Sequence, residues 1–403
     1  MSIAERPGPA GPATLVLAER VLGWNWLEGE RDGFRYRYTR PSPGRYPWQW
    51  YWDSCFAAIV WRRFDPARSR AELESLLAVQ REDGFIGHTI FWDRPVSLLR
   101  LAFYNVASRG ALQTETIQPP LLAWAWRIAV GDPTAEPRIA KQVDWLAANR
   151  DLEGDGLLWI VQPDESGLDA SPKFEPAWGR RAHGAGFPLL VRRNRQLGFN
   201  ARRIRDAGEP VVCETLVNTF WSLSLQALGR PSATPALVAR LWDERRGLFI
   251  DEAQPGGLRP SVITWDSLAP LALPDLPEEI GRRLIEEHLL NAAEFLTSVA
   301  PPSVAASEPS FEPDGGRGLI RRYWRGPTWV NSAWMVWLGL RRLGYREEAR
   351  HLAEGVLEAA AREGLREYYD PRTGKGQGAK DFAWSALVAE LAAPDEGAAK
   401  SYL

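Results

Sequence analysis

The sequence predicts an all-α protein, a double-walled helical toroid of the (α/α)6 barrel type, with long loops at one mouth. Three observations predict this fold. Six segments are apolar on nearly every side, as buried helices are, and amphipathic segments lie between them. Each link from an apolar segment to the next amphipathic one is much shorter than the return that follows. Six inner and six outer helices would then pair as hairpins that close a ring.

Residue types at the segment starts and apolar stripes place the individual helices. The inner helices are predicted to begin near Asp53, Pro119, Glu214, Ser267, Pro327 and Phe382. Several of these residues favour the N-cap or the first turn of a helix. The outer helices are predicted over 12–28, 67–80, 134–149, 232–242, 277–298 and 345–363. Stripes such as Leu352, Val356 and Leu357 recur at helical spacing in these outer segments.

The connections are strongly unequal in length. The short links are 65–66, 131–134, 229–232, 274–277 and 344–345, and the long returns are 29–52, 81–118, 150–213, 243–266, 299–326 and 364–381. In a ring of hairpins all returns meet at the end where the inner helices begin. Loops much longer than about 15 residues are usually functional or disordered, and these are rich in aromatic residues. We therefore expect one catalytic domain over 1–403, with 150–213 inserted in it as a long active-site loop region.

Composition excludes several classes of function. The chain has 403 residues and a formal net charge of −2, so it lacks the basic excess of a nucleic-acid binder. No apolar run reaches about 18 residues, and the first residues show no signal-peptide pattern. Cys55 and Cys213 are too few for a disulfide framework. We expect a cytoplasmic protein with a small-molecule sugar substrate and no nucleic-acid or membrane partner; whether it forms a homo-oligomer stays open.

The segment PGRYPWQWYWDSCF, residues 43–56, crowds aromatic rings around one carboxylate. It holds Tyr46, Trp48, Trp50, Tyr51 and Trp52 next to Asp53. One interpretation is a hydrophobic core whose aspartate caps a helix. The other is a sugar site, in which rings stack on the pyranose and the carboxylate binds hydroxyl groups.

Two other returns carry candidates for acid–base chemistry. Residues 162–174 hold Asp164, Glu165 and Asp169, and residues 365–384 hold Glu367 beside two tyrosines. Ring closure would bring Asp169 and Glu367 to one mouth although they are 198 positions apart. Inverting glycoside hydrolysis needs two carboxyls, one giving a proton to the leaving oxygen and the other activating water, about 6.5–9.5 Å apart. Taken singly, each carboxyl is more often a turn residue, a cap or a solvated side chain.

No cofactor or metal is expected. The sequence has no HExxH, CxxC or paired-aspartate spacing typical of metal sites. The Gly-Lys-Gly at 374–376 lacks the full spacing and the preceding strand of a phosphate loop.

Five segments, in order, resemble those of glycoside hydrolase family 63. PGRYPWQWYWDSCF is similar to the Pro-Gly-Gly-Arg-Phe…Trp-Asp-Ser block of trehalase-type enzymes. Four further segments each resemble a block of family 63; in chain order they are TIQPPLLAWA, SGLDASP, RRYWRGPTWVNSAW and REYYDPRTGKG. These segments span 43–384, nearly the whole chain. The length is similar to that of the bacterial hydrolases of mannosylglycerate and glucosylglycerate in this family, which fold as (α/α)6 barrels.

The resemblance implies roles for individual residues. It implies an inverting mechanism with Asp169 as general acid and Glu367 as general base. It places Trp52, Asp53, Gln118, Gly167 and Trp329 around the sugar, and Tyr46, Tyr323, Trp324 and Gln377 around the glycerate.

Three departures from the family pattern bear on substrate choice. Ala170 stands where the pattern has Asn, and Glu214 where Asp is common. The run 192–206 is unusually basic. It is either a solvated loop or the source of an arginine, such as Arg205, that pairs with the substrate carboxylate.

The predicted function is an inverting α-glycosidase that cleaves a small charged glycoside, mannosylglycerate and/or glucosylglycerate, into hexose and glycerate. The first alternative is an α-glucosidase or trehalase-like hydrolase of a neutral disaccharide. A sugar epimerase would need two catalytic histidines at the mouth, and only His88 and His183 could serve. A non-catalytic carbohydrate-binding toroid would keep the tryptophans without needing facing carboxyls.

Overall fold

The computed structural model describes residues 10–93, 96–97, 101, 103–108, 110–314 and 324–392. It is mostly helical. Within these residues, none of the helices combines the length and the hydropathy that crossing a bilayer requires.

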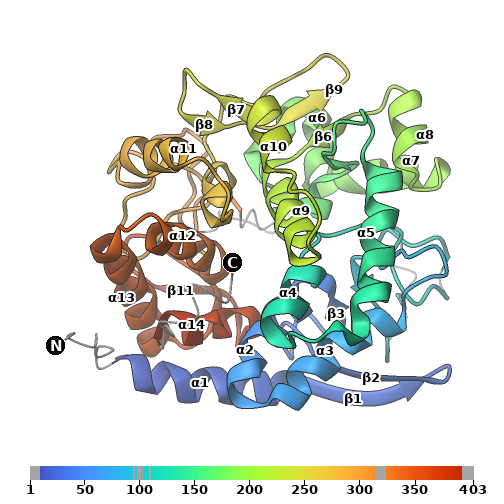
Figure 1. The fold of residues 1–403 in the computed structure, drawn as a ribbon, viewed down its shortest axis with the longest axis horizontal. Helices are drawn as coiled ribbons and strands as arrows, with labels where there is room; N and C mark the ends of the chain where they lie inside the picture. Colours follow the sequence, from blue (N-terminus) through green and yellow to red (C-terminus); the bar gives the residue numbers. More distant parts are fainter. Residues whose placement is uncertain are drawn as a thin grey trace.

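The buried helices are arranged in a closed ring (Figure 1). Each contacts the next along the chain, and the last contacts the first. In order they are α2 (Tyr51–Phe64), α4 (Leu122–Ala129), α9 (Thr215–Ala227), the 3₁₀ helix η6 (Trp265–Ala272), α12 (Val330–Arg342), and η8 (Ala383–Leu387) with its continuation α14 (Val388–Ala392). These are the six segments that the sequence predicts as inner helices.

A second layer packs outside this ring. Each outer element follows or contacts an inner one, as α3 does α2 and α13 does α12. The outer elements are α1 (Ala10–Asn25), α3 (Pro66–Ala78), α5 (Glu136–Arg150), α10 (Thr234–Leu241), α11 (Glu278–Arg283) with η7 (Leu284–Leu289), and α13 (Arg346–Glu363). The N-terminal helix α1 packs on α14, which brings the two ends of the described chain together.

Local chemistry explains the tight links between inner and outer helices. Asp65 caps α3, since its side chain accepts hydrogen bonds from the backbone N–H groups of Ala67 and Arg68. Pro66 follows at the first helical position, where its missing N–H costs nothing. Two helices can therefore reverse direction over a single residue.

The long returns contain short antiparallel strands that the all-α prediction did not include. The pairs are β1 (Trp26–Arg31) with β2 (Phe34–Thr39), β3 (Gln49–Trp50) with β4 (Thr89–Ile90), β7 (Trp242–Asp243) with β8 (Leu248–Phe249), and β10 (Arg366–Tyr369) with β11 (Gly376–Lys380). A further sheet joins β5 (Trp159–Ile160), β6 (Val211–Cys213) and β9 (Glu252–Gln254). Most of these strands have two to five residues, too few for alternation to be recognised in a sequence.

The return 150–213 is built from helical turns. They are η2 (Pro163–Ser166), η3 (Pro172–Phe174), α6 (Glu175–Trp178), η4 (Gly179–Ala182), η5 (Gly184–Gly186), α7 (Phe187–Gln196) and α8 (Ala201–Asp206), and η1 (Pro133–Ala135) precedes α5. The basic run 192–206 supplies the end of α7 and all of α8. Its Arg195 donates to the carbonyls of Val106, Leu101 and Tyr104, so this arginine holds the neighbouring return 81–118.

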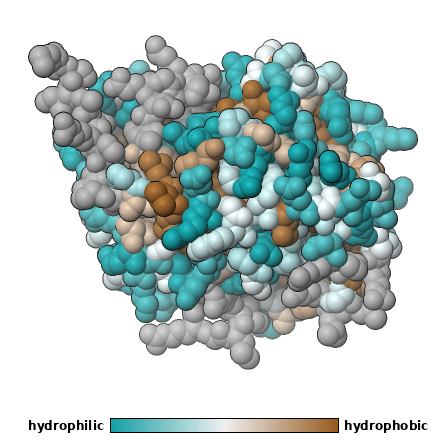
Figure 2. All heavy atoms as spheres, turned by 90° about the horizontal axis from the view of Figure 1, so that it is seen from below, coloured by the Kyte–Doolittle hydropathy of each residue, from teal (hydrophilic) through white to brown (hydrophobic). Residues whose placement is uncertain are grey.

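One large apolar core runs from α1 to α14 and includes side chains from both layers. A small second core surrounds Trp48 and Phe91 in the returns. Figure 2 shows the face at the bottom of Figure 1, where α1 and the β1–β2 hairpin lie, to be mostly hydrophilic with small hydrophobic patches.

Glu72 is a buried carboxyl that joins three elements of this fold. It lies on α3 and accepts hydrogen bonds from Thr39 N (2.7 Å), Thr39 Oγ1 (2.6 Å) and Ser54 Oγ (2.5 Å). Burial raises the pKa of Glu72 to about 8. A folded-state pKa above the unfolded value of about 4.3 means that the neutral form stabilises the fold. This stabilisation is complete below the unfolded pKa and is lost as the pH rises through about 8.

Glu72→Gln is therefore expected to flatten the pH dependence of stability. The free energy of unfolding can be measured by urea titration at about pH 5 and about pH 9. Its decrease from the lower to the higher pH should be smaller in the variant than in the wild type. Glu74→Gln, an exposed change on the same helix, is the matched control. Equal losses in wild type and Glu72→Gln would contradict the prediction.

Candidate active site

One cavity at the mouth of the ring gathers residues from five of the long returns and the helix starts that follow them. Its lining joins acidic, amide and aromatic side chains: Pro41, Tyr46, Trp50, Trp52, Asp53, His88, Gln118, Gly167, Asp169, Trp324, Trp329, Glu367, Phe382 and Trp384. Asp169 and Glu367, far apart in the chain, both lie in this lining.

Asp169 lies in a sharply turning segment between η2 and η3. Gly167, at the end of η2, and Ala170, just after Asp169, both have left-handed backbone conformations, with φ of +75° and +63°. Asn adopts this region more readily than Ala, which gives a physical reason for the Asn of the family pattern at position 170. The two bends present Asp169 to the cavity while its neighbours stay buried.

The other two carboxyls of this segment have different surroundings. Glu165 is buried in a two-point ion pair with Arg150 (2.5 and 2.6 Å) and also accepts backbone hydrogen bonds from Ile117 and Val161. Asp164 accepts from Asn105 (2.7 Å) and Gln162 (2.6 Å). Burial, together with the nearby Asp169, raises the pKa of Asp164 to about 8. Of the three, only Asp169 lines the cavity.

Glu367 lies on β10, and a bulge in the facing strand β11 holds it. The pairing of β10 with β11 shifts register between Arg366 and Tyr368. At the shift, Gly378 has φ +67°, and a Cβ there would lie 2.5 Å from Glu367 Oε2. The bulge turns the N–H of Ala379 to donate to the same oxygen at 2.7 Å. Glycine at 378 thus lets the backbone approach the carboxylate.

Two side chains complete the hydrogen bonding of Glu367, which is 2% exposed. The Tyr46 hydroxyl donates to Oε1 at 2.7 Å, and Arg45 Nη1 donates to Oε2 at 3.3 Å. Burial, and then the Glu367 charge, hold the pKa of Tyr46 well above its usual value, so the phenol keeps its proton and acts as donor. The carboxylate is thereby fixed from three directions.

Tryptophans form the walls of the cavity. Trp324 and Trp329 stack with ring centroids 3.9 Å apart, and Trp52 lies 6.5 Å from Trp324. A Cβ at position 167 would come within 2.5 Å of the Trp52 ring, so only glycine allows this ring and the Asp169 segment to approach. Gln118 accepts a hydrogen bond from Trp52 N at 3.1 Å, which fixes its amide at the cavity.

Asp53 is a cavity residue and does not cap its helix. Trp50 occupies the N-cap position of α2, and Asp53 lies in the first turn, 4% exposed. Burial holds the pKa of Asp53 well above its usual value, with the Glu367 charge contributing. A largely desolvated carboxyl in this position suits hydrogen bonding to sugar hydroxyls.

His88 also lines the cavity, but His183 does not. Burial lowers the pKa of His88 to about 3, so its imidazole is neutral. His183 lies 3.3 Å from Glu175 in the 150–213 return, away from the cavity lining. The two histidines that an epimerase would need are therefore not brought together.

Two of the expected substrate contacts lie outside the cavity lining. Gln377 donates to the carbonyl of Pro313 at 3.1 Å and is not in the cavity lining. Arg205 donates to the carbonyl of Leu152 at 2.6 Å and lies outside that lining, so it is placed to hold its own return. Tyr323 falls outside the described residues.

The structure adds Pro41, Trp50, His88, Phe382 and Trp384 to the lining. Trp50 belongs to the aromatic segment 43–56, and Phe382 and Trp384 open the last inner helix. The sequence places both segments at the mouth of the ring, where the site is expected. In the sequence His88 is a candidate only for epimerase chemistry, and nothing around Pro41 indicates a contribution to the site.

Three buried carboxyls elsewhere have the spacing of a cation site. Glu214, Asp251 and Asp266 place an oxygen each within 4.8 Å of the others. The ammonium group of Lys173 contacts all three, so this lysine supplies the positive charge that a metal ion would bring.

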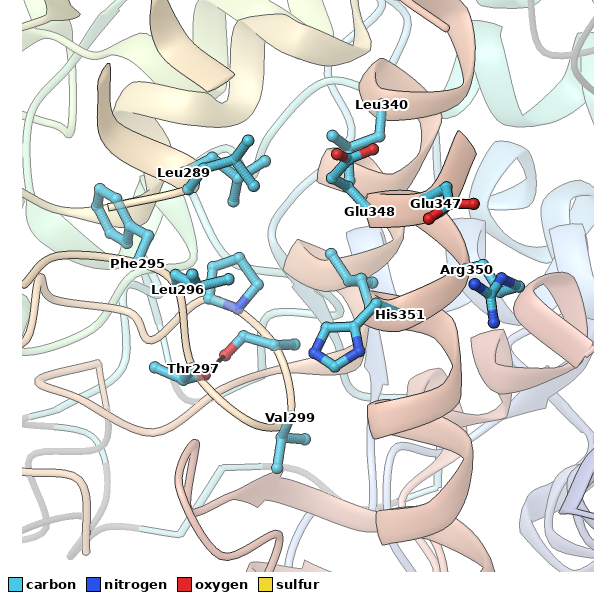
Figure 3. Close-up of a pocket in the computed structure, with 14 residues that line it drawn as sticks. Leu289, Phe295, Leu296, Thr297, Val299, Leu340, Glu347, Glu348, Arg350 and His351 are labelled. Carbon is cyan, nitrogen blue, oxygen red and sulfur yellow. Dashed lines mark hydrogen bonds between the residues drawn. The ribbon is translucent and has the colours of Figure 1, made fainter. Parts of the chain in front are cut away.

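A second cavity, between α13 and residues 289–301, is larger, at about 340 Å³ against about 70 Å³. Figure 3 shows apolar side chains of this segment facing the first turns of α13. Its carboxyls, Glu347 and Glu348, are neighbours in one helical turn and cannot face each other across a substrate. Chemistry rather than size therefore identifies the cavity that holds Asp169 and Glu367 as the candidate site.

Three carboxyls, those of Asp53, Asp169 and Glu367, share one tryptophan-lined cavity at the mouth of a ring of helices, and glycoside hydrolysis uses a pair of carboxyls in one site. Comparison with known families agrees. The chain belongs to the family described as mannosylglycerate hydrolase MGH1-like glycoside hydrolase domain, whose model matches residues 46–385. This confirms the resemblance seen in the sequence.

Individual relatives cover most of the chain. It is 29% identical to the mannosylglycerate hydrolase of Rubrobacter radiotolerans, over 94% of this chain and 97% of that protein. It is 24% identical to the glucosylglycerate hydrolase of Mycolicibacterium hassiacum, over 87% and 92%. The structure is similar to that of the GH63 mannosylglycerate hydrolase from Thermus thermophilus in complex with Tris and D-glycerate. The TM-score is 0.78 and the identity 27%, over 94% of this chain and 99% of that chain.

Proposed function

We propose that this protein hydrolyses the α-glycosidic bond of mannosylglycerate and/or glucosylglycerate with inversion, releasing hexose and glycerate. The observation that carries the proposal is the meeting of Asp169 and Glu367 in one cavity. The names of the relatives supply the substrate class.

In the proposed mechanism Asp169 is the general acid and gives its proton to the glycosidic oxygen. Glu367 is the general base and takes a proton from a water molecule, which attacks the anomeric carbon from the opposite face. The three donors around Glu367 support this role, because they orient the carboxylate. The hexose would lie among Trp52, Asp53, Gln118, Gly167 and Trp329.

The aglycone would be an anion. Arg45 stacks on Tyr46, with its guanidinium carbon 5.1 Å from the ring centroid, and contacts Glu367. It therefore brings positive charge next to two residues of the lining. Tyr46 and Trp324 would border the glycerate, with Tyr46 also orienting the base.

We further propose that the helices form a complete (α/α)6 barrel and that the chain is one catalytic domain. The ring of contacts from α2 round to η8 supports this, as does the core shared by both layers. The return 150–213, which carries Asp169, would be its principal active-site loop.

The decisive experiment is a substrate panel combined with analysis of the first-formed anomer. Mannosylglycerate or glucosylglycerate should be cleaved with a much higher kcat/KM than trehalose, and NMR during early turnover should show β-hexose appearing first. Retention of configuration would reject a mechanism based on direct attack by water. Preference for trehalose would instead support the neutral-disaccharide alternative.

A further inference from the structure

The Lys173 cluster lies four residues beyond Asp169. The side chain of Lys173 is 1% exposed, and its Nζ reaches Glu214, Asp266 at 2.6 Å and Asp251 at 2.9 Å. Although burial opposes its charge, the three carboxyls raise the pKa of Lys173 above its usual value, so it remains an ammonium ion. A single cation thus joins three separate segments of the chain.

Each partner of Lys173 belongs to the framework of the ring. Glu214 caps α9, accepting from Val217 N at 2.6 Å. Asp266 lies in the first turn of η6, beside Trp265, which stacks on the cavity residue Trp324. Asp251 accepts from both Thr215 N (2.9 Å) and Thr215 Oγ1 (2.8 Å) at the start of α9. Lys173 therefore binds to the starts of two neighbouring inner helices.

The chain between Lys173 and Asp169 is short and stiff. Pro172 restricts its own backbone and that of Ser171, and it begins the 3₁₀ helix η3, which contains Lys173. A second contact holds the same stretch from the other side, since Arg325 Nε donates to the carbonyl of Ala170 at 2.9 Å. With both ends of this stretch held, Asp169 has little freedom to shift.

A buried ion cluster adds little to the stability of a fold, because the cost of desolvating the charges cancels most of their attraction. Stability alone therefore does not explain the Lys173 cluster. We propose that Lys173 is a positioning residue: through its contacts with Glu214, Asp251 and Asp266 it sets the position of Asp169 relative to the leaving oxygen. This inference rests on the proposed role of Asp169 as proton donor. Lys173 itself does not line the cavity.

The test compares two substrates of the intact protein. The natural glycoside needs a proton on its leaving oxygen, whereas an α-hexosyl fluoride releases fluoride ion with little help from an acid. In both reactions a C–O bond forms to water and Glu367 takes the proton. A defect confined to proton donation therefore slows the glycoside far more than the fluoride.

Lys173→Met is expected to lower kcat/KM for the glycoside on the order of 10²-fold, because a displacement of about 1 Å can cost that much, while the fluoride is hydrolysed at nearly the wild-type rate. Asp169→Asn should show the same selectivity. Glu367→Gln, which removes the base itself, should slow both substrates alike and serves as the control. If Lys173→Met does not fold, Asp266→Asn, which removes one of the three contacts, should show the same selectivity in smaller measure.

The outcomes separate the two proposals. If Asp169→Asn leaves glycoside hydrolysis intact, the proposed mechanism is wrong at the acid. Suppose instead that Asp169→Asn behaves as expected. If Lys173→Met and Asp266→Asn then slow both substrates equally, or slow neither substrate, Lys173 has only a structural role and the positioning role is overturned.

Discussion

Asp169→Asn should lower kcat for the natural glycoside by roughly 10²- to 10⁴-fold, the range that general acid catalysis contributes. The amide keeps the size of the side chain but has no acidic proton for the leaving oxygen. Because Asp169 is only partly buried at the cavity surface, the free energy of unfolding should change little. Steady-state kinetics and urea unfolding of the variant check both parts of this expectation.

Asp155→Asn is the matched control for that experiment. It makes the same chemical change in the same return, where Asp155 pairs with Arg240 at 2.7 Å away from the cavity. Its kcat should stay near that of the wild type. An Asp169→Asn variant with near-normal kcat would remove Asp169 from the mechanism.

Glu367→Gln should produce a loss of similar size, again roughly 10²- to 10⁴-fold in kcat. Gln cannot take a proton from water, and its amide nitrogen would face donors that now meet carboxylate oxygens. Binding of the product hexose, measured by calorimetry, should survive, since the tryptophan walls are unchanged.

Two further variants bracket this result. Tyr46→Phe removes one charged hydrogen bond of the three on Glu367, worth about 1.5–3 kcal/mol, and should reduce kcat about 10- to 100-fold. Glu363→Gln, at the end of α13 and outside the cavity lining, should leave kcat unchanged. If Glu367→Gln were no more harmful than Tyr46→Phe, a different group would have to activate the water.

Much of the helical framework could be predicted because it depends on local patterns. The six apolar runs became the inner elements α2, α4, α9, η6, α12 and η8–α14, since a helix that is apolar on all sides must be buried. The short strands could not be predicted. A pair such as β10–β11 forms because ring closure brings its segments together and Gly378 permits a bulge, not because either strand has a strong pattern of its own.

The candidate site shows the same division. Asp164, Glu165 and Asp169 lie within six residues and all carry carboxyls, yet Glu165 forms an ion pair with Arg150, and of the three only Asp169 lines the cavity. Gln377 and Arg205 have the right chemistry for the aglycone but are engaged with backbone carbonyls outside the lining. Which polar groups are available to a ligand depends on partners that are distant in the chain.

The order and burial of the helices, the family, and the two carboxyls proposed for catalysis could all be read from the amino-acid sequence, because periodicity and short motifs are written in consecutive residues. Which residues meet could be known only from the folded chain. Folding gives Glu367 its three donors, brings Trp52 against Gly167, and places Lys173 among three carboxyls. Hydrogen bonds, ion pairs and burial depend on distance in space, and closing the ring brings together residues that are far apart along the chain.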